Sequence, residues 1–135
     1  DLYLTNRDKS NFNNENKPKN IIWIDWLKKA QILNKIDILI NCTSLGFDKQ
    51  TDIAPLQEED IRLLKKQSIV YDIIYNPEKT LLLNLAEKNG LKIINGSEMN
   101  LLQAVLAFKY VVNNVDKNIN PEKPMREVAK SKWTQ

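Results

Sequence analysis

Residues that could bind a ligand follow several short apolar runs of the sequence. Asn6-Arg7-Asp8-Lys9, Asn41-Cys42-Thr43-Ser44-Leu45-Gly46, Asp72-Ile73-Ile74-Tyr75-Asn76-Pro77 and Asn95-Gly96 each come directly after, or at the end of, such a run. If the runs are parallel strands of one sheet, their carboxyl ends meet at one edge, where open α/β sheets bind ligands. The sequence therefore predicts a single ligand site built from these four segments.

Histidine is absent from the 135 residues, which limits the chemistry of that site. A Ser-His-Asp triad, a histidine-based metal site and imidazole acid–base catalysis are excluded, and we expect no metal ion. Without a base to activate them, Thr43 and Ser44 are expected to make backbone contacts and shape a turn rather than act as nucleophiles. The single cysteine, Cys42, excludes an internal disulfide and is expected to be a buried, unreactive thiol.

The elements that must position these residues alternate between strand-like and helix-like patterns. Isoleucine-rich runs predict strands at 2–5, 21–24, 38–41, 69–72 and 91–94, and apolar residues at helical spacing predict helices at 56–66, 78–89 and 98–113. This alternation is typical of an α/β fold with a doubly wound, mostly parallel sheet and helices on both faces. Asn76-Pro77 is expected to open the second helix and Asn89-Gly90 to close it.

Two further expectations concern the end of the chain and its boundaries. The helix at 98–113 is apolar almost all round, which predicts burial, and Gln103 is a polar exception on it. Residues 1–114 are interpreted as one domain and 115–135 as a C-terminal tail with a short helix. The chain begins with Asp1 inside an apolar alternation, so we expect it to be a fragment of a longer protein.

Composition argues against two classes of partner, nucleic acids and membranes, and indicates the compartment. A net charge of +3 is too small to indicate nucleic-acid binding, and no apolar run approaches the roughly 20 residues of a membrane span. A single cysteine fits a reducing compartment, so a cytoplasmic location is expected.

Four motifs, in order along the chain, resemble those of the shikimate dehydrogenase family. Asn6-Arg7 resembles the start of its Asn-Arg-Thr motif, and Asn41-Cys42-Thr43-Ser44-Leu45-Gly46-Phe47 resembles its Asn-Ala-Thr-Ser-x-Gly-Met segment. The segment from Val70 to Leu82 resembles its Val-x-Asp-x-x-Tyr-x-Pro-x-x-Thr-x-Leu-Leu segment, and Asn95-Gly96 with Met99, Leu101 and Gln103-Ala104 resembles the start of its final helix.

This resemblance implies the C-terminal, nucleotide-binding part of a Rossmann-like enzyme that reduces 3-dehydroshikimate to shikimate with NADPH, a step toward chorismate and the aromatic amino acids. It implies that Tyr75 and Gln103 contact the substrate. The implied cofactor-binding residues are Asn6, Arg7, Asp8, Thr43, Ile73 and Gly96. The family's first strand, its glycine-rich loop and its N-terminal substrate domain with the catalytic lysine and aspartate are missing, so the chain alone is expected to be inactive.

Two alternatives remain open at this point. Asp8 stands where the family has a threonine that contacts the 2′-phosphate of NADP, and a carboxylate there also suits the free ribose hydroxyl of NAD. An NAD-dependent quinate/shikimate dehydrogenase is therefore one alternative. The other is a non-catalytic α/β interaction module, for example a homodimer formed through the open sheet edge at residues 2–5.

Overall fold

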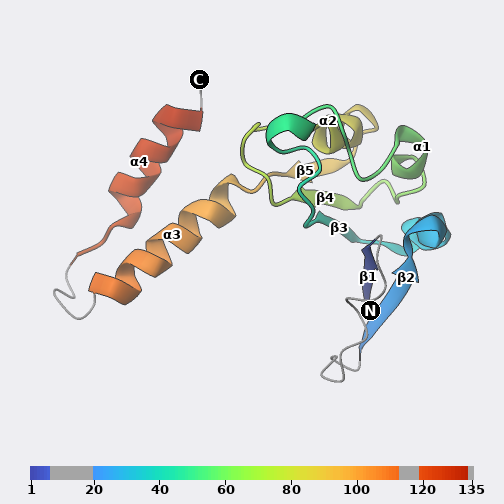
Figure 1. The fold of residues 1–135 in the computed structure, drawn as a ribbon, viewed down its shortest axis with the longest axis horizontal. Helices are drawn as coiled ribbons and strands as arrows, with labels where there is room; N and C mark the ends of the chain where they lie inside the picture. The colour runs from blue at the N-terminus through green and yellow to red at the C-terminus, as the bar shows by residue number, and fades with distance from the viewer. Residues whose placement is uncertain (7–19, 113–118, 134–135) are drawn as a thin grey trace.

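The computed structural model describes residues 1–6, 20–112 and 119–133, and it confirms the predicted α/β class with parallel strands (Figure 1). Each predicted strand is present, with ends within one residue of those expected. The strands are β1 (Leu2–Asn6), β2 (Ile21–Asp25), β3 (Ile38–Asn41), β4 (Ile69–Asp72) and β5 (Lys92–Ile94).

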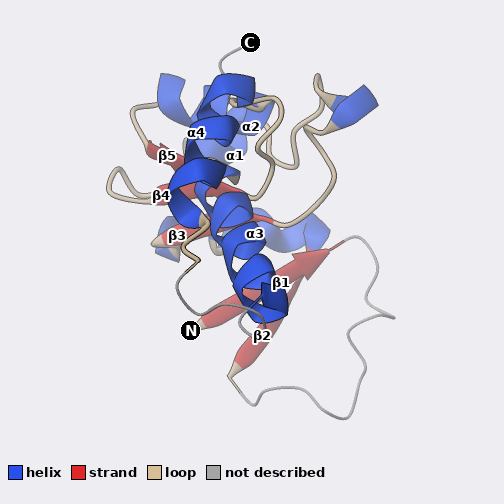
Figure 2. Ribbon diagram, turned by 90° about the vertical axis from the view of Figure 1, so that its left-hand side faces the viewer, coloured by secondary structure: helices blue, strands red, loops and turns tan. Residues whose placement is uncertain are grey.

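The strands form two parallel sheets, β1–β2 and β3–β4–β5, rather than one continuous sheet. Figures 1 and 2 both place β1 and β2 beyond β3, on the side away from β5, which gives the spatial order β2, β1, β3, β4, β5. Within the described residues no strand ladder joins β1 to β3. The sheet is thus interrupted between these two strands.

The two faces of the β3–β4–β5 sheet differ in how well they are covered. Val70 in the central strand points to the face under α1 and α2 and is fully buried. On the other face Ile40, Tyr71 and Ile94 are register partners across the three strands, and Ile40 and Ile94 are 51% and 42% exposed. The prediction of helices over both faces is therefore correct for one face only in the described part of the chain.

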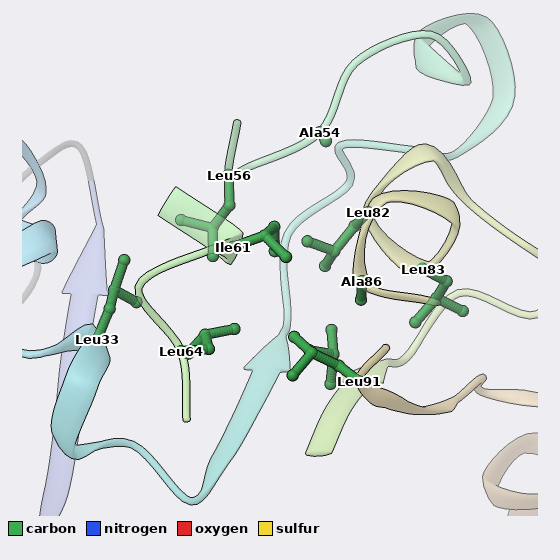
Figure 3. Packing of buried hydrophobic residues seen from close by; sticks show 10 residues of the cluster. Leu33, Ala54, Leu56, Ile61, Leu64, Leu82, Leu83, Ala86 and Leu91 are labelled. Atoms are coloured by element: carbon green, nitrogen blue, oxygen red, sulfur yellow. The ribbon is translucent and has the colours of Figure 1, made fainter. Parts of the chain in front are cut away.

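The hydrophobic core lies between the covered face and the helices packed on it (Figure 3). Side chains from α2 (Leu81–Lys88) meet those of the segment around α1 (Glu58–Ile61), and full burial of each leucine or isoleucine contributes about 1.5–3 kcal/mol. The cluster consists of Leu33, Ala54, Leu56, Ile61, Leu64, Val70, Leu82, Leu83, Ala86 and Leu91. Short 3₁₀ helices, η2 (Trp26–Gln31), η3 (Leu33–Lys35) and η4 (Asp48–Gln50), complete the connections.

Two predicted helices are shorter than expected. The predicted helix at 56–66 is regular only in α1, because the backbone beyond it tightens into turns in which the Leu63 and Leu64 N–H groups bond carbonyls three residues back. The expected start at Asn76-Pro77 is wrong: Thr80 caps α2 by accepting a hydrogen bond from the Leu83 N–H. The predicted stop is confirmed, with Asn89 as C-cap and Gly90 at a φ of +78°.

Helix α3 (Ser97–Val112) has the expected bounds within a residue but not the expected burial. Only Leu101 and Val105 are buried in it, whereas Leu106, Tyr110 and Val111 are largely exposed. Figure 1 shows the reason: α3 leads away from both sheets, and α4 (Glu122–Trp133) lies beside it. None of the helices in the described ranges is long and apolar enough to span a membrane.

Candidate functional site

The strands share a way of ending that shapes the edge where the site was predicted. At or just after the end of β2, β3, β4 and β5, an Asn or Asp side chain accepts a hydrogen bond from the backbone N–H two residues later. These Asx turns favour an abrupt change of chain direction at a strand end. The pairs are Asp25 with Leu27, Asn41 with Thr43, Asp72 with Ile74, and Asn95 with Ser97.

Asn41, at the end of β3, uses its whole hydrogen-bonding capacity. Its Oδ1 accepts from the Thr43 N–H (2.9 Å) and from the Thr43 hydroxyl (2.7 Å). Its Nδ2 donates to the Leu45 carbonyl (3.2 Å) and to Asp72 Oδ1 (3.1 Å). A side-chain amide has two donors and two acceptor positions, so Asn41 is fully satisfied and fixes the loop after β3.

Asp72, at the end of β4, links that loop to the next one and to α2. Its Oδ1 also accepts from the Ile74 N–H (3.1 Å), and its Oδ2 accepts from the Thr80 hydroxyl (2.7 Å). Both Asp72 and Thr80 are completely buried. A carboxylate removed from water needs such partners, because an unpaired buried charge costs several kcal/mol.

The backbone ties the three strand ends of the larger sheet together. The Ile73 N–H bonds the Asn41 carbonyl (3.2 Å), and the Gly96 N–H bonds the Ile74 carbonyl (3.0 Å). A Cβ on Gly96 would lie 1.8 Å from the Ile73 carbonyl oxygen, so only glycine permits this approach. The loop after β4 is therefore held from both sides.

Gly46 closes the loop after β3 against the start of α2. Its φ of +104° is in the region that favours glycine, and a Cβ there would lie 3.2 Å from two carbons of the Thr80 side chain. Gly46 and Thr80 therefore come into contact although 34 positions separate them in the sequence. The loop after β3 and the first turn of α2 thus share one packed surface.

Three of the six predicted cofactor residues lie together at this edge. Thr43 follows β3, Ile73 follows β4 and Gly96 follows β5. The Thr43 N–H donates to the Asn41 side chain and the Ile73 N–H donates to the Asn41 carbonyl, while Gly96 packs against the Ile73 carbonyl. The Thr43 N–H and hydroxyl both donate to Asn41, and the hydroxyl also accepts from the Leu45 N–H. Thr43 thus shapes the turn, as the sequence suggested.

The other predicted cofactor residues are Asn6, Arg7 and Asp8. Asn6 ends β1 in the smaller sheet, and its Oδ1 is buried without a hydrogen-bond partner among the described residues. A buried carbonyl oxygen of this kind is suited to a donor supplied by a ligand. Arg7 and Asp8 lie outside the described residues.

A surface cavity of about 590 Å³ lies between the less covered sheet face and α3, and Gln103 is among its lining residues. Tyr75 is not part of that lining; it lies on the loop after β4, one residue beyond Ile74, and is 36% exposed. Both predicted substrate residues are therefore accessible to solvent. The hydrogen bond from the Gly96 N–H to the Ile74 carbonyl joins the start of the helix that carries Gln103 to the loop that carries Tyr75. The cavity is lined by Tyr71, Ile94, Asn95, Glu98, Met99, Leu102, Gln103 and Leu106.

Arg126 of α4 balances the negative charge of Glu98, one of the residues that line the cavity. Arg126 donates to both carboxylate oxygens of Glu98 (2.6 and 2.7 Å) and to Glu122 (3.2 Å). The hydrogen bonds to Glu98, and then to Glu122, raise the pKa of the Arg126 guanidinium above its ordinary value. Glu98 is therefore engaged in a bidentate ion pair, and the cavity is predominantly apolar with Gln103 and Asn95 as its neutral polar groups.

This arrangement suits binding and orientation rather than proton transfer. The groups at the strand ends are backbone amides, carbonyls, a hydroxyl, carboxamides and the carboxylates of Asp25 and Asp72, which accept hydrogen bonds from the backbone. Within the described residues no cluster of three or more potential ligands could hold a metal ion. The expectation that Cys42 is buried is wrong: it is exposed, in the loop directly after the buried Asn41 that ends β3.

Sequence reasoning did not select Asn41, Asp72 or Thr80 as residues that build the site. Their signal is visible in retrospect: a polar residue ends each of two otherwise apolar runs, and Asn41 and Asp72 fall at paired positions once the runs are aligned as neighbours. The pairing itself depends on strand register, which the residue pattern alone does not reveal.

Comparison with known proteins connects this geometry to an enzyme family, although no protein-family model matches the chain. Shikimate dehydrogenase (NADP(+)) of Caldanaerobacter subterraneus subsp. tengcongensis is 44% identical over 82 residues, 61% of this chain and 28% of that protein. The enzyme of the same name from Methanosphaera stadtmanae is 30% identical over 131 residues, 92% of this chain and 46% of that protein. The chain thus spans less than half the length of either relative.

A solved structure of a protein with the same enzyme name has a fold similar to that of this chain. The crystal structure of a shikimate dehydrogenase in complex with NADP⁺ superposes with a TM-score of 0.66 at 31% identity. The match covers 84% of this chain and 36% of the other chain. This similarity confirms the Rossmann-like fold expected from the sequence motifs.

Proposed function

We propose that this chain, a homologue of part of the shikimate dehydrogenases, is the cofactor-binding half of an oxidoreductase that reduces 3-dehydroshikimate to shikimate with NADPH. The observation that carries the proposal is the joining of Thr43, Ile73 and Gly96 at one sheet edge by Asn41, Asp72 and close backbone contacts. Three separate motifs of the family meet there in the folded chain.

The residues of this chain bind and orient, while the dinucleotide supplies the hydride when it is bound. The buried Oδ1 of Asn6, which has no hydrogen-bond partner among the described residues, supports a ligand that lies along the strand ends. In this proposal Gln103, which lines the cavity, and Tyr75, on the loop after β4, hold hydroxyl and carboxylate groups of the substrate.

The choice between NADP and NAD rests on Arg7 and Asp8. A guanidinium fork suits the 2′-phosphate of NADP, whereas the carboxylate of Asp8 suits the ribose hydroxyls of NAD. We propose NADP as the main cofactor, because the two curated relatives carry NADP(+) in their names.

The strand order supports a role as part of a larger domain. Doubly wound dinucleotide-binding sheets have the order 3-2-1-4-5-6. The observed order β2, β1, β3, β4, β5 matches it if one strand belongs between β1 and β3, where the sheet is interrupted. That strand and the loop after it would supply the pyrophosphate contacts, so we propose that the chain alone has no dehydrogenase activity.

A non-catalytic interaction module is the second candidate. The observation that favours it is the exposed apolar pair Ile38 and Ile40 on β3, together with the exposed apolar residues of α3. On that reading the face would be covered by a partner or a second copy of the chain, and no dinucleotide would bind.

Titration of the complete protein that contains this chain with NADP⁺ separates the two candidates. We expect saturable binding that Arg7→Ala weakens by about tenfold to a hundredfold, because a hydrogen bond to a charged group contributes about 1.5–3 kcal/mol. Tryptophan fluorescence or calorimetry measures the dissociation constant, with NAD⁺ as the parallel ligand.

Arg62→Ala is the matched control, since Arg62 is an exposed arginine at the C-terminal end of α1 that pairs with Glu58. It should leave the dissociation constant unchanged. Absence of saturable binding of either dinucleotide to the unsubstituted protein would contradict the enzyme proposal and favour the interaction module.

A further inference from the structure

Three polar side chains, Asn41, Asp72 and Thr80, are buried beneath the predicted dinucleotide site without forming part of it. Their exposed fractions are 4%, 0% and 0%. They come from three different elements, the ends of β3 and β4 and the cap of α2. Hydrogen bonds of 3.1 and 2.7 Å join them into one chain, with Asp72 in the centre.

Stability alone does not account for a carboxylate at this place. Burying a charged group costs several kcal/mol, and apolar side chains of similar volume are often at least as stabilising as a buried polar network. The rest of the neighbouring core is apolar, with Val70, Leu82 and Leu83 nearly or fully buried. A polar network inside such a core is better explained by the geometry that it imposes.

The bonds of this network end on the backbone of the loops that carry the predicted cofactor residues. Asn41 accepts from the Thr43 N–H and donates to the Leu45 carbonyl, on the loop after β3. Asp72 accepts from the Ile74 N–H, immediately after Ile73 on the loop after β4. The network therefore fixes the backbone on both sides of the positions that would face the dinucleotide.

We propose that Asp72, with Asn41 and Thr80, positions the loops after β3 and β4 for dinucleotide binding. This inference rests on the proposed function and assigns roles to three residues that make no direct contact with the ligand. Loss of the Thr80 hydroxyl should let the two loops shift relative to each other, because Asp72 would lose the donor to its Oδ2 and keep only the two donors to its Oδ1. A displacement of about 1 Å at a binding site is enough to lower affinity or rate strongly.

The test replaces Thr80 with valine, which keeps the shape of the side chain and the carbons that contact Gly46 but removes the hydroxyl. The dissociation constant for NADP⁺ is measured on the complete protein under conditions in which each variant is folded by circular dichroism. We expect Thr80→Val to raise the dissociation constant for NADP⁺ about tenfold. Thr80→Ser keeps the hydroxyl and should bind NADP⁺ as the unsubstituted protein does.

Ser68→Ala is the matched control for a purely structural effect. Ser68 is also 0% exposed and also donates a 2.7 Å hydrogen bond, to the Ile36 carbonyl, but it precedes β4 at the opposite edge of the sheet. Urea unfolding should show a loss of stability for both variants, larger for Thr80→Val because it also removes the cap of α2. Only Thr80→Val should weaken NADP⁺ binding.

Equal NADP⁺ affinity for the unsubstituted protein and Thr80→Val, or equal weakening in Thr80→Val and Ser68→Ala, would overturn the inference. If Thr80→Val does not fold, Asp72→Asn replaces it, with the same expected weakening and the same refuting result. Failure of the unsubstituted protein to bind NADP⁺ would overturn the proposed function and this inference with it. Binding by the unsubstituted protein with unaffected variants would overturn the inference alone.

Discussion

Replacing Gly96 with alanine should lower the free energy of unfolding by about 3 kcal/mol or more, at the upper end of the cost of inserting a carbon into a packed site. The added Cβ would lie 1.8 Å from the Ile73 carbonyl oxygen and 2.4 Å from its carbon, both backbone atoms that cannot rotate away. Either the start of α3 or the loop after β4 must move. Urea unfolding followed by circular dichroism measures the loss.

Gly90→Ala is the control for the backbone contribution of a glycine. Gly90 has a φ of +78°, but no neighbouring atom lies within 4 Å of the place that a Cβ would take, so its substitution costs only the left-handed conformation, about 1–2 kcal/mol. A smaller loss of stability for Gly96→Ala than for Gly90→Ala would show that the close approach at Ile73 does not exist in solution.

Replacing Gln103 with leucine should lower kcat/KM for shikimate by about tenfold to a hundredfold, because a lost hydrogen bond to a buried substrate group costs roughly 1–3 kcal/mol. Gln103 is one of the few neutral polar groups in an apolar cavity, so leucine fits the volume and removes the donor and acceptor. The dissociation constant for NADP⁺ should not change. Steady-state kinetics in both substrates separates the two effects.

Asn100→Leu is the matched substitution for Gln103→Leu. It removes the same carboxamide group from the same helix, one turn earlier, at a position that does not line the cavity. It should leave the kinetics with shikimate unchanged. Equal losses in both variants, or a loss of NADP⁺ binding in Gln103→Leu, would show that the effect comes from the helix rather than from substrate contact.

The strands were predictable because their signal is local. Isoleucine-rich runs bounded by Asn, Asp or Gly have few alternatives to a buried strand, and the ends of β3 and β4 agree with the predicted ranges to the residue. The stop at Asn89-Gly90 was equally local, since glycine at positive φ ends a helix wherever it packs.

The features that could not be predicted depend on distant parts of the chain. Thr80 caps α2 in place of Asn76 because its hydroxyl also reaches Asp72, a contact that exists only once β4 and α2 are packed. The apolar surface of α3 predicted burial, but burial needs a covering surface. Among the described residues, α4 and the sheet residues that line the cavity cover only part of that helix. The sequence likewise indicated parallel strands without indicating the interruption between β1 and β3.

The candidate site was predictable at the level of loops and motifs rather than side-chain roles. The resemblance selected Thr43, Ile73 and Gly96, which lie together at the edge formed by the strand ends. The side chains that hold their loops there are Asn41 and Asp72. Whether a polar residue faces a ligand or supports one that does is decided by register and burial, which neighbouring strands determine together.

Shikimate-dependent reduction of NADP⁺ by the complete protein tests the central claim most directly. We predict that NADPH absorbance appears only when protein, shikimate and NADP⁺ are all present, and that residues 1–135 alone give none. A well-folded complete protein that binds neither dinucleotide, and reduces neither NADP⁺ nor NAD⁺ with shikimate or quinate, would contradict it.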